Sequence, residues 1–181
     1  MIISAGRNEI FDFALPMGVG LVDMSINLTK FICENRQSLP SEIIFVGSAG
    51  LYKEGEILKI YESRSAANCE ISALYELSYS PINYEILARN STNVSYETIT
   101  NSSTFITTDK KSALKFFERG YFLENMEFFA VLKVAQKFQI PAYGIFCATN
   151  FCDSNAHTDF LKNHAAAKEN LTKYLKTKAL I

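Results

Sequence analysis

Apolar positions recur at two different spacings along the chain, and the change from one spacing to the other predicts helices and strands. Between Leu21 and Phe31 the apolar side chains follow one another at steps of three and four, the spacing of a helix with one buried face. We expect this helix to end before Pro40. Residues 126–138 and 158–178 have the same helical spacing. The pattern therefore predicts long helices in the first and last thirds of the chain.

Short apolar runs predict strands between these helices. Residues 43–46 and 142–147 are almost wholly apolar, as expected of strands that are buried on both faces of a sheet. Residues 9–15 alternate between apolar and polar side chains, and residues 57–61 and 96–100 also have the pattern of strands. Strands and helices therefore alternate along the sequence.

Turn and capping residues complete this pattern. Asp109 can cap a further helix that Gly120 can end. Pro81 and the polar cluster at 90–93 mark loops. Alternating helices and continuous apolar strands are typical of an α/β domain with a mainly parallel or mixed sheet. We expect one domain over residues 1–181, in which a central mixed sheet lies between helices in three layers.

The composition narrows the class of protein. Of the 181 residues, 48% are hydrophobic and 20% are charged, and the formal net charge is −1. This balance gives no electrostatic reason to expect nucleic acid or an anionic membrane as a partner. No apolar run approaches the ~20 residues that a spanning helix needs, and the first residues lack the pattern of a signal peptide. We therefore expect a cytoplasmic protein.

The cysteines and histidines lack the spacing of a metal site. The four cysteines are Cys33, Cys69, Cys147 and Cys152. They form no Cys-x-x-Cys pair, so neither a zinc site nor a redox motif is indicated, and we expect reduced thiols. His157 and His164 lie seven residues apart around the start of the last helix, with no further ligand beside them. We expect no metal and no cofactor.

Three segments place small or polar groups where a predicted strand ends or a predicted helix begins. They are Gly47-Ser48-Ala49-Gly50, Met126-Glu127 and Thr149-Asn150. In open α/β sheets, ligands bind beyond the carboxyl ends of the strands. We therefore expect the first and third segments to face one ligand.

Each segment also has a purely structural explanation. The glycines can serve a turn, or they can allow the backbone to approach a ligand closely. The Glu127 carboxylate can accept hydrogen bonds from a vicinal diol, or it can cap the helix that it opens. The Asn150 amide can bind a base edge that presents a donor and an acceptor, or it can stabilise its own turn. The neighbouring Glu124 is expected to be solvated.

The order of these segments carries a resemblance to a known family. The matching segments are Met17-Gly18-Val19-Gly20, residues 44–50, Gly55-Glu56-Ile57, Thr104-Phe105-Ile106, Asn125-Met126-Glu127 and Ala148-Thr149-Asn150. They resemble the purine nucleoside phosphorylase and nucleosidase family, with the methylthioadenosine/adenosylhomocysteine nucleosidases as the most similar branch. The resemblance extends from about Phe13 to the C-terminus. It implies a nucleoside phosphorylase-like fold and a homodimer or larger homo-oligomer.

The resemblance also implies a reaction and residue roles. The reaction is cleavage of the N-glycosidic bond of a purine nucleoside, by water or by phosphate as a co-substrate. Glu127 and Asn150 are the implied catalytic residues; Glu127 holds the ribose hydroxyls, and Asn150 meets N7 and the six-position of the base. The implied substrate-binding residues are Ser48, Ala49, Gly50, Thr104, Phe105, Ile106 and Met126. Among them, Phe105 stacks on the purine.

Two departures from the family pattern affect the expected substrate and nucleophile. Adenine-acting members carry an aspartate at the place of Asn150, whereas asparagine occurs in branches that act on 6-oxopurines, so inosine or guanosine is favoured. Hexameric phosphorylases carry a phosphate-binding arginine at the place of Phe45, which puts phosphorolysis in doubt. The alternative is a degenerate, non-catalytic member that binds a nucleoside or purine, or acts in a complex.

The N-terminus can be aligned with the family in two ways. If residues 2–6 form the first strand, Glu9 falls where nucleosidases keep a water-activating glutamate. If residues 9–15 are a later strand, the first strand is missing and the chain is N-terminally shortened. We favour the second alignment because few residues separate Glu9 from Pro16. It leaves the activator of the nucleophile unassigned, with Arg7 as a further charge near the site.

Overall fold

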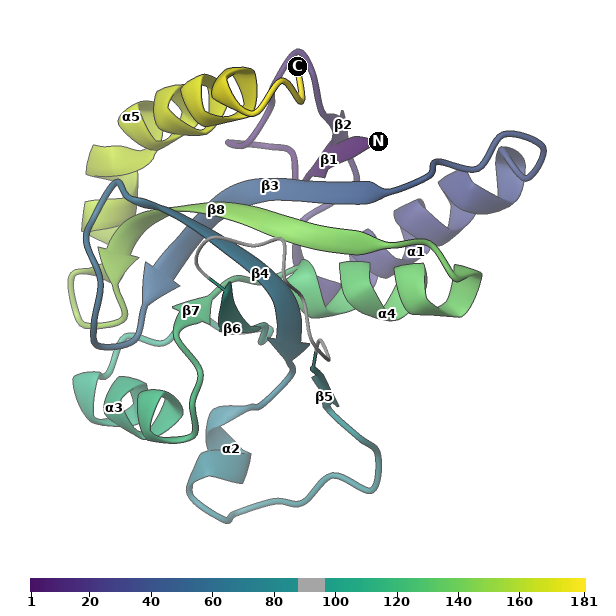
Figure 1. Cartoon of the computed structure of the whole chain (residues 1–181). Coiled ribbons are helices and arrows are strands. Elements are labelled where there is room, and N and C mark those ends of the chain that lie inside the picture. The colour runs from purple at the N-terminus through teal and green to yellow at the C-terminus, as the bar shows by residue number, and fades with distance from the viewer. Residues whose placement is uncertain (88–96) are drawn as a thin grey trace.

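A mixed sheet lies at the centre of the computed structural model, which describes residues 1–87 and 97–181 (Figure 1). Eight strands join in this sheet within the described residues. They are β1 (Ile2–Ser4), β2 (Leu15–Pro16), β3 (Ile43–Leu51), β4 (Ile60–Ala67), β5 (Glu85–Ile86), β6 (Glu97–Asn101), β7 (Leu123–Glu124) and β8 (Ala142–Phe151). The helices are α1 (Gly20–Glu34), α2 (Ile71–Leu74), α3 (Lys110–Glu118), α4 (Phe128–Phe138) and α5 (Ala156–Thr177). The predicted loop at 90–93 lies outside the described residues.

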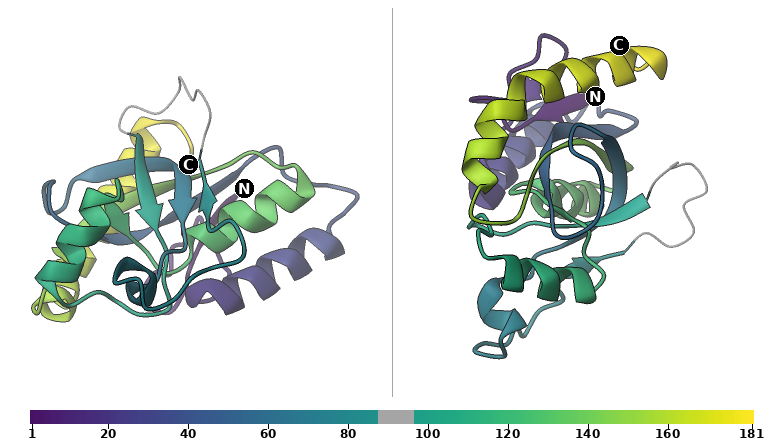
Figure 2. Two further views of the ribbon diagram at one scale, coloured as in Figure 1. Left: turned by 90° about the horizontal axis from the view of Figure 1, so that it is seen from below. Right: turned by 90° about the vertical axis from the view of Figure 1, so that its left-hand side faces the viewer.

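The strands curve into a closed ring. β3 runs parallel to β8, and the pairing shifts register between Ala49 and Gly50. β8 pairs antiparallel with β4, β4 parallel with β6, β6 parallel with β7, and β7 antiparallel with β3. The right-hand view of Figure 2 looks into this ring. β1 and β2 extend the sheet beyond β3, so the N-terminal segment reaches the same region as the ends of β3 and β8.

Helices cover the sheet on opposite sides. α1 and α4 pack against each other on one side, and α5 lies along β8 and β3 on the other (Figure 1). Met24, Leu28 and Ile32 of α1 are fully buried in the first of these layers. Leu171 and Leu175 of α5 fill the second layer. The predicted mixed sheet with flanking helices is therefore confirmed.

The helix predictions are largely confirmed. Of the predicted apolar positions of α1, Met24 and Leu28 are buried and Leu21 and Phe31 are half-buried, and Ile32 is buried in addition. The Asp109 carboxylate caps α3 by accepting a hydrogen bond from the backbone N–H of Ser112 at 2.8 Å. Helices α4 and α5 begin and end within two residues of their predicted bounds.

Two predicted strands continue further than their apolar runs. β3 reaches Leu51 and β8 reaches Phe151, so Gly47-Ser48-Ala49-Gly50 and Thr149-Asn150 lie inside strands. Neither glycine of the first segment has a positive φ. The predicted turns at these places are wrong, and the small residues instead lie within strands β3 and β8 of the sheet.

The predicted strand at residues 9–15 is also wrong. Residues 10–14 contain turns and no regular strand, and Glu9 makes only an isolated bridge with Gly6. The first strand is β1, which pairs in parallel with β3. The favoured alignment of the N-terminus is therefore wrong, and the alternative, with residues 2–6 as the first strand, describes the chain.

None of the helices in the described ranges combines the length and apolar character needed to cross a membrane. The four cysteines are free thiols, and three of them are buried. Within the same ranges no three His, Cys, Asp or Glu side chains come together in a way that could hold a metal ion.

Candidate active site

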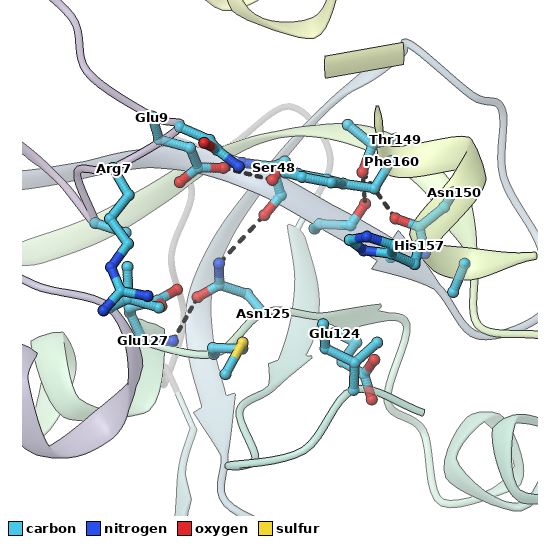
Figure 3. A pocket seen from close by; sticks show the side chains of 18 of the residues that line it. Arg7, Glu9, Ser48, Glu124, Asn125, Glu127, Thr149, Asn150, His157 and Phe160 are labelled. Atoms are coloured by element: carbon cyan, nitrogen blue, oxygen red, sulfur yellow. Dashed lines mark hydrogen bonds between the residues drawn. The ribbon is translucent and has the colours of Figure 1, made fainter. Parts of the chain in front are cut away.

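One cavity gathers most of the predicted site residues (Figure 3). Its volume is about 290 Å³, and it lies where β3 and β8 meet the loop after β1 and the first turns of α4 and α5. The predicted residues that line it are Ser48, Ala49, Gly50, Ile106, Met126, Glu127 and Asn150. The pattern of small and polar residues therefore predicts the place of the site, although the local structure differs from the expected turns.

Glu9 lies in this cavity and is bonded to Ser48. The backbone N–H of Ser48 donates to Glu9 Oε1 at 2.6 Å, and the Ser48 hydroxyl donates to the same oxygen. A Cβ atom at Gly47 would lie 2.9 Å from Glu9 Oε2, so the glycine makes room for this carboxylate. Burial raises the pKa of Glu9, and the hydrogen bonds from Ser48 oppose that shift. The carboxylate is held in place while Oε2 accepts no hydrogen bond from the described residues.

The turn between β1 and β2 fixes the backbone of Glu9. Its N–H donates to the carbonyl of Gly6 at 2.9 Å, and its own carbonyl accepts the hydroxyl of Ser4 at 2.8 Å. Gly6 has a φ of 88° and Arg7 a φ of 53°, so the chain reverses sharply here. The sequence signal for this arrangement is Gly6 shortly before Glu9, which the strand assignment at 9–15 concealed.

Asn125, and not Glu127, caps α4. Asn125 Oδ1 accepts hydrogen bonds from the backbone N–H groups of Glu127 and Phe128, both at 2.9 Å. The Asn125 amide also donates to the carbonyl of Ser48 at 3.2 Å, which ties the start of α4 to β3. The Glu127 side chain makes no capping hydrogen bond to α4, and an interaction of its charge with the helix dipole stays a prediction.

Glu127 points across the cavity towards the start of another helix. Its Oε1 accepts the backbone N–H of Gly20, the first residue of α1, at 2.7 Å. Burial raises the pKa of Glu127 to about 7; the N–H of Gly20 lowers it, and the nearby charge of Glu9 raises it further. Two buried carboxyl groups thus influence each other in one cavity, and burial favours the protonated form of both.

Asn150 lies on β8 with a fixed amide. Its Oδ1 accepts the Thr149 hydroxyl at 2.8 Å, and its Nδ2 donates to the carbonyl of Phe151 at 3.0 Å. A Cβ atom at Gly50 would lie 3.1 Å from Nδ2, so this glycine leaves space for the amide. An amide nitrogen carries two hydrogens, so one donor remains after the bond to Phe151. The turn-stabilising explanation for Asn150 does not apply inside a strand.

The predicted base-contacting segment is only partly at the cavity. Thr104, Phe105 and Ile106 follow β6 in irregular structure rather than in a strand. Ile106 lines the cavity, whereas Thr104 is exposed, and Phe105 is 74% exposed and not among the lining residues. The stacking role implied for Phe105 stays a prediction, without a contact at this cavity.

Glu124 is buried, contrary to the expectation of a solvated side chain. It is 5% exposed and lines the cavity from β7. Its carboxylate accepts hydrogen bonds from Thr107, Tyr52 and Cys152. Burial raises its pKa, and these hydrogen bonds lower it. Sequence reasoning missed this burial because the partners are 17 to 72 residues away along the chain.

Negative charge outweighs positive charge around the cavity. Glu9, Glu124 and Glu127 line it, and Arg7 is the one Lys or Arg among the described lining residues. His157, from the first turn of α5, also lines it, whereas His164 does not. Phe45 is fully buried in the core against Phe128 and Phe146 and offers nothing to an anion. The site is suited to a neutral ligand rich in hydroxyl groups.

The sequence matches no protein-family model and none of the curated proteins. The structure, by contrast, is similar to solved nucleosidases over nearly its whole length. A futalosine hydrolase mutant of Helicobacter pylori matches with a TM-score of 0.78 and 17% identity, covering 97% of this chain and 95% of that one. A 5′-methylthioadenosine/S-adenosylhomocysteine nucleosidase of the same organism, with butyl-thio-DADMe-Immucillin-A, matches at 0.79 and 17%, with the same coverage.

A third similar structure comes from Borrelia burgdorferi. It is a putative 5′-methylthioadenosine/S-adenosylhomocysteine nucleosidase bound to adenine, with a TM-score of 0.76, 19% identity and 99% of both chains covered. At identities this low the comparisons show the fold. The resemblance in the sequence is therefore confirmed at that level: this chain has the α/β fold of the nucleoside phosphorylase and nucleosidase structures.

Proposed function

We propose that this chain hydrolyses the N-glycosidic bond of a purine nucleoside, with a 6-oxopurine as the leaving base. The observation that carries the proposal is the position of Glu9, whose carboxylate is fixed by Ser48 in the same cavity as Glu127 and Asn150. The fold is that of solved nucleosidases, and one of these is bound to adenine.

Glu9 is the group that activates water. A carboxylate whose pKa is raised by burial is a stronger base than an exposed one, and Oε2 accepts no hydrogen bond from the described residues. As the water oxygen bonds to C1′ and the bond from C1′ to N9 breaks, the water gives a proton to Glu9. The electrons of the broken bond leave with the base.

Glu127 holds the ribose. Its carboxylate lies on the same side of the cavity as Glu9, apart from Asn150, and as an acceptor it can bind the two vicinal hydroxyls of the sugar (Figure 3). Negative charge beside the ring also stabilises the positive charge that develops on the sugar as the glycosidic bond breaks. Met126 lines the cavity next to Glu127 and offers the ring an apolar contact.

Asn150 favours a base that leaves with two acceptors side by side. N7 and O6 of a 6-oxopurine are both acceptors, whereas adenine presents a donor at its six-position. The hydrogen that remains on Asn150 Nδ2 can bond to N7 or O6 and stabilise the charge of the departing base. An amide has no proton to give to N7, so a base that spreads its own charge is the better leaving group.

Water is a more suitable nucleophile than phosphate here. Three carboxyl groups line the cavity against one arginine, and Phe45 is buried in the core. A phosphate dianion would meet this negative field without the cluster of cations that anion sites usually supply.

Base release from a panel of nucleosides tests the proposal. Purified protein is incubated with inosine, guanosine, adenosine and methylthioadenosine, with and without phosphate, and the free base is separated by chromatography. We expect release from inosine or guanosine in both conditions. Release that requires phosphate would contradict the hydrolytic route, and preferential release of adenine would contradict the role of Asn150.

A non-catalytic nucleoside-binding protein is the second candidate. The observation in its favour is the Asn150 amide, which binds a base but cannot protonate it. Calorimetry with inosine and hypoxanthine separates the two candidates. Binding of both ligands without any conversion of inosine would support the binding protein.

We also propose a cytoplasmic homo-oligomer, most simply a homodimer. Support comes from apolar side chains at the surface, among them Val22 and Ile26 on one face of α1, which are 69% and 59% exposed. Light scattering coupled to size-exclusion chromatography measures the mass in solution. A monomer at all accessible concentrations would contradict this part of the proposal.

A further inference from the structure

The buried carboxylate of Glu124 has no cationic partner among the described residues. The ion pairs described there involve other glutamates and lie at the surface. Burying an unpaired carboxyl group is costly, so such a group needs several hydrogen bonds in compensation. The contacts of Glu124 show which part of the fold depends on it.

Every contact of Glu124 is with a donor. Oε2 accepts the backbone N–H of Thr107 at 3.0 Å and the thiol of Cys152 at 3.6 Å. Oε1 accepts the Thr107 hydroxyl at 2.5 Å and the Tyr52 hydroxyl at 3.2 Å. The Tyr52 oxygen itself receives the amide of Asn101 at 3.0 Å, so its own hydrogen is free to point at Glu124. Both oxygens of the carboxylate are occupied by protein donors.

Thr107 is the one buried residue between positions 104 and 109, while Ser102 and Ser103 at the start of the segment are also buried. Residues 102–109 connect β6 to α3, and Ile106 within them lines the cavity. Thr107 is 1% exposed, whereas Ile106 is 51% exposed. The other described side-chain contact that ties residues 103–106 to a distant element is exposed: the N–H of Thr104 meets Glu70 at 3.3 Å. Ser102 is held separately, because its hydroxyl accepts the backbone N–H of Phe129 and its carbonyl accepts the Asn68 amide. The bond between Thr107 and Glu124 therefore sets the position of residues 104–108.

The anchored segment belongs to the same end of the cavity as Asn150. Gly50 pairs with Glu124 on β7 on one side and with Asn150 on β8 on the other. Figure 3 shows Glu124 well apart from Glu9 and Glu127. We propose that Glu124 is a positioning residue: it clamps residues 104–108 through Thr107, so that Ile106 forms the wall of the cavity beside Asn150, against the ligand's base. That the ligand carries a base rests on the proposed function.

Hydrogen exchange tests the clamp without reference to activity. In Glu124→Gln only one oxygen remains to accept, so the N–H and the hydroxyl of Thr107 can no longer donate to separate oxygens of this side chain, and the contact with Thr107 is weakened. We expect the exchange of peptides that cover residues 104–108 to become about ten-fold faster or more, as for the loss of ~1.4 kcal/mol of protection. Thr107→Val, which removes the hydroxyl but keeps the shape, is expected to act in the same direction, and Thr107→Ser to stay near the parent.

Glu70→Gln is the matched control. It makes the same substitution at an exposed contact of the same segment, and we expect exchange and activity to stay unchanged. Parent-like exchange in both Glu124→Gln and Thr107→Val would overturn the clamp. If either variant fails to fold, the other gives the decision, and Thr107→Ser shows whether the hydroxyl is what matters.

Steady-state kinetics test whether Glu124 affects the binding of the ligand. With inosine as substrate we expect KM to rise about ten-fold in Glu124→Gln while kcat changes less than about two-fold, since Ile106 contacts the ligand and not the reacting atoms. An unchanged KM beside faster exchange would overturn the link to the base. If no nucleoside is cleaved, the proposed function fails separately, and the exchange data with calorimetric affinity for hypoxanthine still decide on the clamp.

Discussion

Glu9 and Glu124 stand at two places in one cavity and are held by the same kind of partner. Each accepts the backbone N–H and the hydroxyl of one residue, Ser48 for Glu9 and Thr107 for Glu124. Glu9 takes both bonds on Oε1, whereas Glu124 divides them between its oxygens and adds Tyr52 and a cysteine. Burial raises the pKa of both. A free acceptor, rather than burial or a raised pKa, therefore distinguishes a carboxylate available to a ligand from one that holds the fold.

A large loss of activity is expected at Glu127, second only to that at Glu9, and we group both residues as available to the ligand. Glu127→Ala removes the acceptor for the ribose hydroxyls and should cost ~2–4 kcal/mol of transition-state stabilisation, a fall in kcat/KM of about 30- to 1,000-fold. Steady-state kinetics with inosine measure it. A parent-like kcat/KM would place Glu127 with Glu124, as a structural carboxylate.

The pH dependence of stability tests the shared burial. The pKa of Glu127 is raised from 4.5 to about 7 in the folded protein, so the folded state keeps a proton that the unfolded chain has lost. The free energy of unfolding should therefore fall as the pH rises from about 4.5 to about 7, by about 3 kcal/mol at most. Urea unfolding at pH 5 and pH 8 measures the change. Glu127→Gln should reduce the change without abolishing it, because Glu9 and Glu124 also have raised pKa values, and a protein that is more stable at pH 8 would contradict the shift.

Stability should separate the two matched carboxylates. In Glu9→Gln the amide oxygen can still accept both Ser48 donors, so the free energy of unfolding should stay within about 1 kcal/mol of the parent. In Glu124→Gln no rotamer keeps acceptors at both positions, and the loss should be ~1.5–3 kcal/mol. Urea unfolding measures both variants. Equal losses of stability would show that Glu9 and Glu124 do not differ in how much they stabilise the fold.

A smaller loss of stability than in Glu124→Gln is expected at Asn125, which caps α4 and bonds to Ser48, the partner of Glu9. Asn125→Ala removes the bonds to the N–H groups of Glu127 and Phe128 and should cost ~1 kcal/mol of stability. Asn155→Ala is the control, because Asn155 precedes α5 without a side-chain capping bond. Thermal unfolding measures both. A larger loss of stability in Asn155→Ala than in Asn125→Ala would contradict the stabilising role assigned to the Asn125 cap.

The fold was predictable because its signals are local. Helical spacing marks the buried face of α1, and apolar runs mark the cores of β3 and β8. The strand ends were hidden because Gly47, Ala49 and Gly50 resemble a turn in sequence. In the structure Gly47 and Gly50 leave no room for a Cβ atom, because the side chains of Glu9 and Asn150 lie against them. That reason involves residues 38 and 100 positions away and has no local sign.

Only the part of the site that lies on β3, on β8 and at the start of α4 was predictable. Ser48, Glu127 and Asn150 converge as expected, since strands β3 and β8 run parallel and α4 starts beside them. Glu9 was misplaced by a weak alternation over residues 9–15. Glu124 looked solvated because a two-residue strand has no periodicity to read, and its burial comes from distant partners such as Thr107.

The most direct test of the account is the release of hypoxanthine from inosine without phosphate, compared between the parent, Glu9→Gln and Glu62→Gln. Glu62 is a buried glutamate outside the cavity, bonded to Tyr174 at 2.6 Å, and serves as the matched control. We predict that the parent and Glu62→Gln release the base, and that kcat of Glu9→Gln is lower by about 100- to 10,000-fold. A Glu9→Gln variant as active as the parent would show that Glu9 does not activate the water.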